Sequence, residues 1–249
     1  MQNRYTGDIG DYSKLGLLRA LQSAGFSIGL NWYLTPDETH NSDGRHVDYL
    51  KQEKYRACDP GLWLGLKAIV DGDNREVRYM ENDDILQATF FSDCLDFSDD
   101  DVSGKRKCKP KAERTALRVD WFRRSLARLA AKDIVCVDPD NGLVVPSAKG
   151  SPKENKYVLP EELASYYAQG STVVYYQHKA RRKDPFYTDQ LKALLRREDL
   201  PGASGLALKF EKVSQRYYML IIQPQHREMV EKSVKNMLST PWGDHFRQL

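Results

Sequence analysis

Apolar residues along the chain form short continuous runs and longer amphipathic stretches. The runs at 134–137 and 172–176 are typical of strands buried on both faces of a parallel sheet. Segments 206–210 and 217–222 are separated by a short polar turn, which predicts an antiparallel hairpin. Segments 26–34 and 76–80 are the remaining predicted strands.

Between these runs, apolar residues recur at helical spacing. Helices are predicted over 13–24, 114–131, 160–167, 184–197 and 225–238. The first carries Leu15, Leu18 and Leu21 on one face, and the second is expected to turn Arg114, Arg118, Arg124 and Arg128 outward. Strands that alternate with helices predict a three-layer α/β/α Rossmann-like sandwich with a mainly parallel sheet and a C-terminal antiparallel hairpin.

Composition supports one domain. With 249 residues and 41% hydrophobic content, the chain can bury one sizeable core, so residues 1–249 are expected to fold as a single domain. The charged segment 96–112 is nearly free of apolar residues and is predicted to be a flexible insertion.

Other features bear on the protein's location. No stretch approaches the roughly 20 apolar residues that a membrane span needs, and the first residues lack the apolar region of a secretion signal. The four cysteines are scattered without CxxC pairing, which suits a reducing compartment. A cytoplasmic protein without a membrane partner is expected.

Basic residues occur in clusters, although the formal net charge is only +3. The clusters lie at 105–109, 123–124, 179–183 and 196–197. Clustered lysines and arginines are the electrostatic footprint of a polyanion partner. The alternative for each cluster is a solvated surface.

A polar cluster follows the predicted strand 134–137. It comprises Asp138, Pro139, Asp140, Asn141 and Gly142. In open α/β sheets, ligands bind beyond the carboxyl ends of the strands, and two carboxylates with an amide can hold a water, a metal or a base edge. The alternative is a plain turn, because these residue types favour turns for backbone reasons.

Two more strand ends are polar. Tyr176 and His178 are followed by the basic residues Lys179, Arg181 and Arg182. A histidine at a strand end can relay a proton or stabilise a developing anion, and the alternative is a surface histidine in a basic loop. Segment 31–45, which includes Asn41 and Asp43, is interpreted as a ligand loop, with a solvated loop as the alternative.

The segment before the first predicted helix combines two glycines with Asp8 and Asp11. Exposed amides at a helix N-terminus suit anions, which favours a role in the site. The acids could instead cap the helix, although capping needs only one of them.

Several catalytic motifs are absent from the chain: GxGxxG, the Walker A sequence, HExxH and GxSxG. Their absence disfavours P-loop nucleotide hydrolysis and serine-hydrolase chemistry.

The order of elements resembles bacterial adenine-N6 methyltransferases that act on ribosomal RNA. Residues 6–14 are similar to that family's Ala-Gly-Asn-x-x-Asp-x-x-Lys-His segment, and 138–141 stand where the family has Asp-Pro-Pro-Tyr. A later strand at 173–177 and the final hairpin also match. The resemblance implies the fold and S-adenosylmethionine as cofactor. However, 34–39 lack the family's cofactor-loop glycines, and Asn141 replaces the aromatic residue that stacks on adenine.

A second resemblance concerns two short motifs. Uracil-DNA glycosylases place an Asp-Pro motif that handles water after one strand, and a histidine motif that supports the departing base after a later strand. Asp138-Pro139 and His178 follow that order. The chain also resembles bacterial proteins that share GDIGDY and DPDNGL, a group expected to include phage-defence DNA glycosylases.

These observations together predict a DNA glycosylase that acts on a flipped base, including modified phage bases, without a metal or other cofactor. Asp138 or Asp140 would orient water and stabilise positive charge on the sugar, and His178 would support the departing base. Asp8 and Asp11 could join them in the site. The predicted substrate-binding residues are Asn141, which would read the base edge, Asn41, Asp43, Tyr176, Lys179, Arg181 and Arg182. The loops at 105–109 and 179–183 would hold phosphates of DNA.

Three alternatives remain open. The first is an S-adenosylmethionine-dependent methyltransferase with a degenerate cofactor loop. The second is a metal-dependent nuclease that uses Asp8, Asp11, Asp138 and Asp140. The third is a non-catalytic nucleic-acid-binding module.

Overall fold

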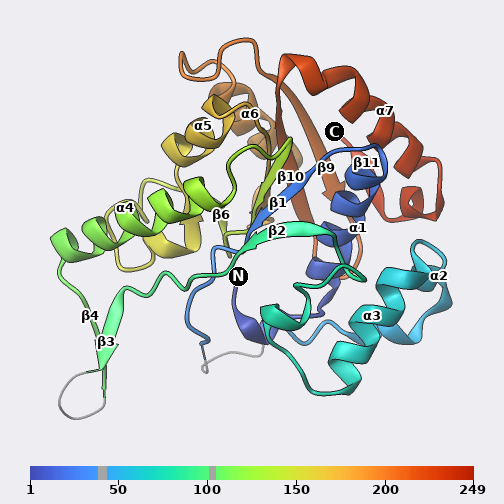
Figure 1. Cartoon of the computed structure of the whole chain (residues 1–249), viewed down its shortest axis with the longest axis horizontal. Coiled ribbons are helices and arrows are strands. Elements are labelled where there is room, and N and C mark those ends of the chain that lie inside the picture. Colours follow the sequence, from blue (N-terminus) through green and yellow to red (C-terminus); the bar gives the residue numbers. More distant parts are fainter. Residues whose placement is uncertain (39–43, 101–104) are drawn as a thin grey trace.

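The computed structural model describes residues 1–38, 44–100 and 105–249. Within them, a seven-stranded sheet runs through the centre of the molecule in the order β2-β1-β5-β8-β10-β9-β11 (Figure 1). Its strands are β1 (Ile28–Asn31), β2 (Ala88–Phe91), β5 (Ile134–Val137), β8 (Thr172–His178), β9 (Ser204–Phe210), β10 (Arg216–Ile222) and β11 (Phe246–Gln248).

Strands β2, β1, β5 and β8 are parallel, whereas β10 runs antiparallel between β8 and β9. The mainly parallel sheet and the antiparallel hairpin are therefore confirmed. Asn31 pairs with Val137, which in turn pairs with Tyr175, so three parallel strands reach the same edge of the sheet together. Strand β8 continues beyond that edge to His178, which lies opposite Arg216.

Helices cover both faces of the sheet (Figure 1). Helices α1 (Ile9–Ser23), α3 (Pro60–Asp71) and α7 (Arg227–Leu238) supply one hydrophobic core, and α4 (Lys111–Arg128), α5 (Pro160–Ala168) and α6 (Asp184–Leu194) supply the other. Side chains of a strand alternate between the two cores, as Cys136 and Val137 do. This is the predicted three-layer α/β/α sandwich.

Short elements complete the described chain. They are the 3-10 turns η1 (Asn3–Tyr5), η2 (Asp48–Lys51), η3 (Val77–Tyr79), η4 (Glu154–Lys156), η5 (Pro224–His226) and η6 (Pro241–Asp244), helix α2 (Glu53–Arg56), and the ribbons β3 (Ser98–Asp100) with β4 (Arg106–Cys108) and β6 (Gly142–Leu143) with β7 (Tyr157–Val158).

The strand predicted at 76–80 is wrong, because Val77–Tyr79 forms a 3-10 turn. Val77 and Met80 are both buried, and their spacing of three residues is that of a helical turn, not of an alternating strand. The edge strand is instead β2, whose residues are mostly half-buried.

The first helix begins at Ile9, four residues before the predicted start, and buries Leu15, Leu18 and Leu21 as expected. Its earlier start places Asp11 within its first turn.

The prediction that Arg118 faces outward is wrong. Its side chain is buried, with Nε 2.7 Å from Oε1 of Glu162 on α5. Arg118 also donates to the carbonyl oxygens of Glu154 and Tyr157. Oε2 of Glu162 accepts a further hydrogen bond from Nη2 at 2.8 Å. These four acceptors stabilise a buried guanidinium at a position where helical spacing alone predicts exposure to solvent.

Segment 96–112 contains the antiparallel ribbon β3–β4, which projects from one end of the molecule (Figure 1). Arg106 pairs with Asp96 at 2.6 Å, and Lys109 pairs with both Asp99 and Glu113. Two of the basic residues of this insertion, Arg106 and Lys109, therefore have acidic partners within it or just beyond it.

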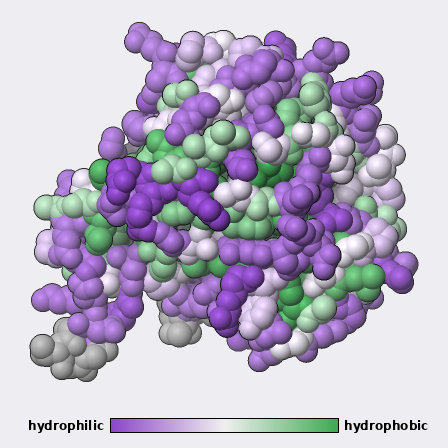
Figure 2. All heavy atoms as spheres, viewed as in Figure 1, coloured by the Kyte–Doolittle hydropathy of each residue, from purple (hydrophilic) through white to green (hydrophobic). Residues whose placement is uncertain are grey.

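The surface seen in Figure 2 is mostly hydrophilic, with hydrophobic atoms emerging over α3 and α4. The exposed apolar side chains there include Leu64 on α3 and Val119 on α4, which is 65% exposed. Among the helices of residues 1–38, 44–100 and 105–249, none has the length and apolar character needed to cross a bilayer.

Candidate functional site

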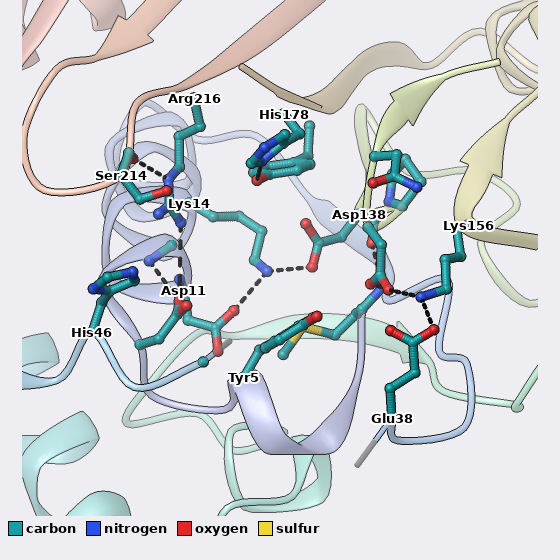
Figure 3. A pocket seen from close by; sticks show the side chains of 18 residues that line it. Tyr5, Asp11, Lys14, Glu38, His46, Asp138, Lys156, His178, Ser214 and Arg216 are labelled. Carbon is teal, nitrogen blue, oxygen red and sulfur yellow. Dashed lines mark hydrogen bonds and ion pairs between the residues drawn. The ribbon is translucent and has the colours of Figure 1, made fainter. Parts of the chain in front are cut away.

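A cavity of about 380 Å³ lies where the carboxyl ends of β5 and β8 and the start of β10 meet the N-terminus of α1 (Figure 3). Its walls are dominated by charged and polar side chains. The lining residues are Met1, Tyr5, Asp8, Gly10, Asp11, Lys14, Glu38, Gly44, His46, Asp138, Pro139, Asp140, Asn141, Lys156, Tyr176, His178, Ser214 and Arg216.

Both acids at the start of α1 line this cavity. Asp8 is the N-cap, and its Oδ1 accepts hydrogen bonds from the backbone nitrogens of Gly10 at 2.6 Å and Asp11 at 3.2 Å. Oδ2 of Asp11 accepts from the backbone nitrogen of Gly7 at 2.9 Å, with Gly7 at a φ of +77°. Asp8 therefore caps the helix and also lines the cavity, and Asp11 lines the cavity beside it.

Lys14 crosses the floor of the cavity and joins two acids (Figure 3). Its Nζ lies 2.8 Å from Oδ1 of Asp11 and 2.5 Å from Oδ2 of Asp138, and it stands 4.6 Å from the centre of the Trp32 ring. All three charged side chains are at most 7% exposed. Two carboxylates and one ammonium leave this buried cluster with a net negative charge.

Burial sets the protonation of this cluster. Desolvation lowers the pKa of Lys14, but Asp11 and Asp138 raise it by more, so its net pKa rises and Lys14 stays a cation. Desolvation raises the pKa of Asp11 to about 6; Lys14 opposes this shift, while Asp8 and Asp138 add to it.

Asp138 and Asp140 have different surroundings although they stand two residues apart. Asp138 follows β5, and its backbone nitrogen donates to the carbonyl oxygen of Asn31 at 3.0 Å. Oδ2 of Asp140 accepts from Nε2 of Gln2 at 2.8 Å, and Oδ1 lies 2.5 Å from the Met1 amino group. Desolvation raises the pKa of Asp140, but Met1, Gln2 and Lys156 lower it further, so Asp140 remains an anion.

Hydrogen-bond donors line the opposite wall of the cavity. Tyr176, His178 and Arg216 point to the same face of the sheet, since His178 pairs with Arg216 and side chains alternate along a strand. Arg216 is buried, and its Nε donates to the carbonyl oxygen of Ser214 at 2.9 Å. Its Nη1 is 4.0 Å from Oδ1 of Asp8. His178 is exposed, with Nδ1 3.4 Å from the Tyr176 hydroxyl.

The basic loop after β8 differs from the other basic clusters. Lys179 is half-buried, Arg181, Arg182 and Lys183 are exposed, and none of the four forms a salt bridge to any residue that the structure describes. Arg182 stacks on the Phe186 ring at 5.5 Å. Elsewhere Arg124 pairs with Asp120 and Asp93, and Arg197 pairs with Asp199 and Glu161. The loop at 179–183 thus leaves its positive charge uncompensated at the end of the strand that brings His178 to the cavity.

The structure brings most of the predicted site residues together. Seven of them line one cavity: Asp8, Asp11, Asp138, Asp140, Asn141, Tyr176 and His178. Lys179, Arg181 and Arg182 lie on the adjacent loop and not in the lining. Asn41 and Asp43 fall outside the described residues.

Four charged lining residues were not selected from the sequence: Lys14, His46, Lys156 and Arg216. A fifth, Glu38, belongs to segment 31–45, which was interpreted as a ligand loop. For Lys14 a signal existed, because positions 14, 18 and 21 share one helix face, and a lysine there interrupts an apolar stripe. Arg216 is the first residue of the fully buried strand β10 and directly precedes the predicted strand 217–222, which is a weaker signal.

Across residues 1–38, 44–100 and 105–249, no three His, Cys, Asp or Glu side chains lie close enough together to hold a metal ion. The acids of the cavity are instead in contact with Lys14, Gln2 and Met1.

No protein-family model matches the chain, and neither does any curated protein. Among solved structures, it is similar to a Legionella pneumophila (strain Philadelphia 1) protein of the DUF519 family, with a TM-score of 0.48 and 9% sequence identity. That alignment covers 98% of this chain and 96% of the Legionella chain. No activity is named for that protein.

Proposed function

We propose that this protein is a hydrolase that cleaves the N-glycosidic bond of a base flipped out of DNA. The observation that carries the proposal is the position of Asp138. Lys14 holds this buried carboxylate at the cavity floor, and the donors His178 and Arg216 line the same cavity. A carboxylate facing donors suits a reaction in which positive charge grows on a sugar while negative charge grows on the departing base.

In the proposed step, the bond between the sugar C1′ and the base nitrogen breaks, and its electron pair leaves with the base. Asp138 stabilises the cationic sugar and orients a water, whose oxygen forms the new bond to C1′. Because Oδ2 of Asp138 contacts Lys14, we assign Oδ1 to the water. His178 supports the leaving base, which ends with the proton that the water loses, so the products are a free base and an abasic sugar.

The size of the cavity favours a base-sized ligand. At about 380 Å³ it lies near the lower end of small-molecule sites, so a duplex cannot enter and the base must leave the stack. The uncompensated loop at 179–183 supports contact with the phosphates on either side of that base.

The test is mass spectrometry of the products after incubating the protein with plain phage DNA and with base-modified phage DNA. We expect a free base to be released without added cofactor. The variant Asp138→Asn should slow release by roughly 10²- to 10⁴-fold, the range for one positioned acid–base group. Asp189→Asn is the matched control, since Asp189 is an exposed residue of α6 outside the cavity. Absence of any free base, or full activity of Asp138→Asn, would refute the proposal.

A second candidate is the methyltransferase, and one observation favours it. Strand β10 lies antiparallel between β8 and β9, and Asp138-Pro139 follows β5, as the resemblance implies. Against it, the described residues after β1 up to Glu38 include no glycine, and Tyr33 takes a φ of +46° there. Adding S-adenosylmethionine to the same incubation separates the two candidates, because methylation adds the mass of one methyl group to the nucleic acid.

A further inference from the structure

Val213 combines three unusual properties at the tip of the β9–β10 hairpin. It is 62% exposed, it is β-branched, and its φ is +62°. Left-handed backbone is disfavoured for any residue with a Cβ, and for a β-branched side chain it is a genuine outlier. Glycine or asparagine would occupy this position without that strain. An exposed, strained valine contributes little to folding, so its role is sought at the surface.

The hairpin tip is attached to the candidate site. Ser214, the next residue, lines the cavity, and its carbonyl oxygen accepts from Nε of Arg216 at 2.9 Å (Figure 3). Arg216 pairs with His178, so the hairpin tip and the basic loop that follows His178 lie at the same end of adjacent strands. Val213 therefore stands at the rim of the cavity, next to Lys212, which is also exposed.

A protein that extracts a base from a duplex must separate stacked neighbours, and DNA-binding proteins do this by inserting an apolar side chain between base steps. We propose that Val213 is such a wedge, entering the base stack while Arg181 and Arg182 contact the backbone. This inference rests on the proposed function, because it assigns DNA as the ligand of the same site.

The test uses Val213→Gly, which removes the side chain and also relieves the backbone strain. Its thermal midpoint should equal or exceed that of the wild type, so a loss of function cannot come from unfolding. Val119→Ala is the matched control, since Val119 is an equally exposed valine on α4, outside the cavity.

Base unstacking is measured by fluorescence in a short duplex carrying 2-aminopurine beside a mismatched pair, and binding is measured on the same duplex by anisotropy. The wild type and Val119→Ala should raise the fluorescence. Val213→Gly should reduce the equilibrium constant for unstacking at least about tenfold, which corresponds to about 1.4 kcal/mol. Its binding to the duplex should be largely retained. The fluorescence responses would then assign the wedge to Val213.

The outcomes separate the two proposals. Equal fluorescence from the wild type and Val213→Gly would overturn the wedge and leave glycosylase activity untouched. Unstacking that depends on Val213, without release of free base, would support the wedge and refute the glycosylase reaction. If the wild type fails to bind the duplex, or binds it without a rise in fluorescence, the wedge is overturned.

Discussion

The Nζ atom of Lys14 lies 2.5 Å from Oδ2 of Asp138, although 124 positions separate the two residues. The contact joins the first turns of α1 to the end of β5, and both side chains are almost fully buried. Burying a charge is costly unless it is paired, so the pair stabilises the fold only while both partners are present. The same pairing holds the carboxylate to which we assign the reaction.

Replacing Lys14 with methionine should destabilise the protein by roughly 3–5 kcal/mol, because Asp11 and Asp138 would be left buried without their cation. Urea denaturation of the variant and the wild type measures the difference. Lys51→Met serves as a control, since Lys51 pairs with Asp48 on the open surface and should hardly matter. Equal effects of the two substitutions would contradict the pairing of Lys14.

Asp11 should make stability fall as the pH rises from about 4 to 6. Its pKa is raised to about 6, chiefly by burial, so between these pH values the folded state binds a proton that the unfolded state has lost. The Asp11→Asn variant should lack this contribution to the pH dependence of stability. The difference in unfolding free energy between wild type and variant, measured across this range, should therefore decline with pH and level off above 6. A difference that rises with pH would show that the pKa of Asp11 is lowered.

Neutralising Arg181 and Arg182 together should flatten the salt dependence of DNA binding. Each phosphate contact contributes about 0.9 to the slope of log K against log salt on duplex DNA, so the double glutamine variant should lose about 1.8. Arg123→Gln with Arg124→Gln is the matched control, since both arginines pair with Asp120 on α4. Identical slopes for the wild type and the Arg181/Arg182 variant would remove the loop from the interface.

Asp140 and Asp138 should respond differently to the same substitution. Asp140→Asn replaces one acceptor by a donor beside Met1 and Gln2, which should cost about 1–3 kcal/mol of stability. Its rate of base release is expected to fall far less than that of Asp138→Asn, because both carboxylate oxygens of Asp140 already contact Met1 and Gln2. Single-turnover rates of the two variants at saturating DNA decide this. The assignment is reversed if Asp140→Asn shows the larger loss.

The local hydrophobic pattern was sufficient to predict an element where burial of apolar side chains alone determined it. The strand Ile134–Val137 was predicted to the residue, because a short apolar run that ends at Asp-Pro is typical of a strand buried on both faces. The prediction of a strand at 76–80 was wrong because the buried residues there, Val77 and Met80, are three positions apart. A segment of four to five residues is too short to distinguish this helical spacing from the alternating pattern of a strand. Arg118 was misplaced because its partner Glu162 is 44 positions away.

The sequence by itself determined the layer architecture and the polar strand ends, since both follow from periodicity and from the residue types that close a strand. Only the tertiary structure decided which polar residues meet. It separated Asp138, tied to Lys14, from Asp140, tied to Met1 and Gln2, and it distinguished the uncompensated loop at 179–183 from basic clusters that have acidic partners. The physical reason is that charge interactions depend on distance in space, which sequence separation does not report.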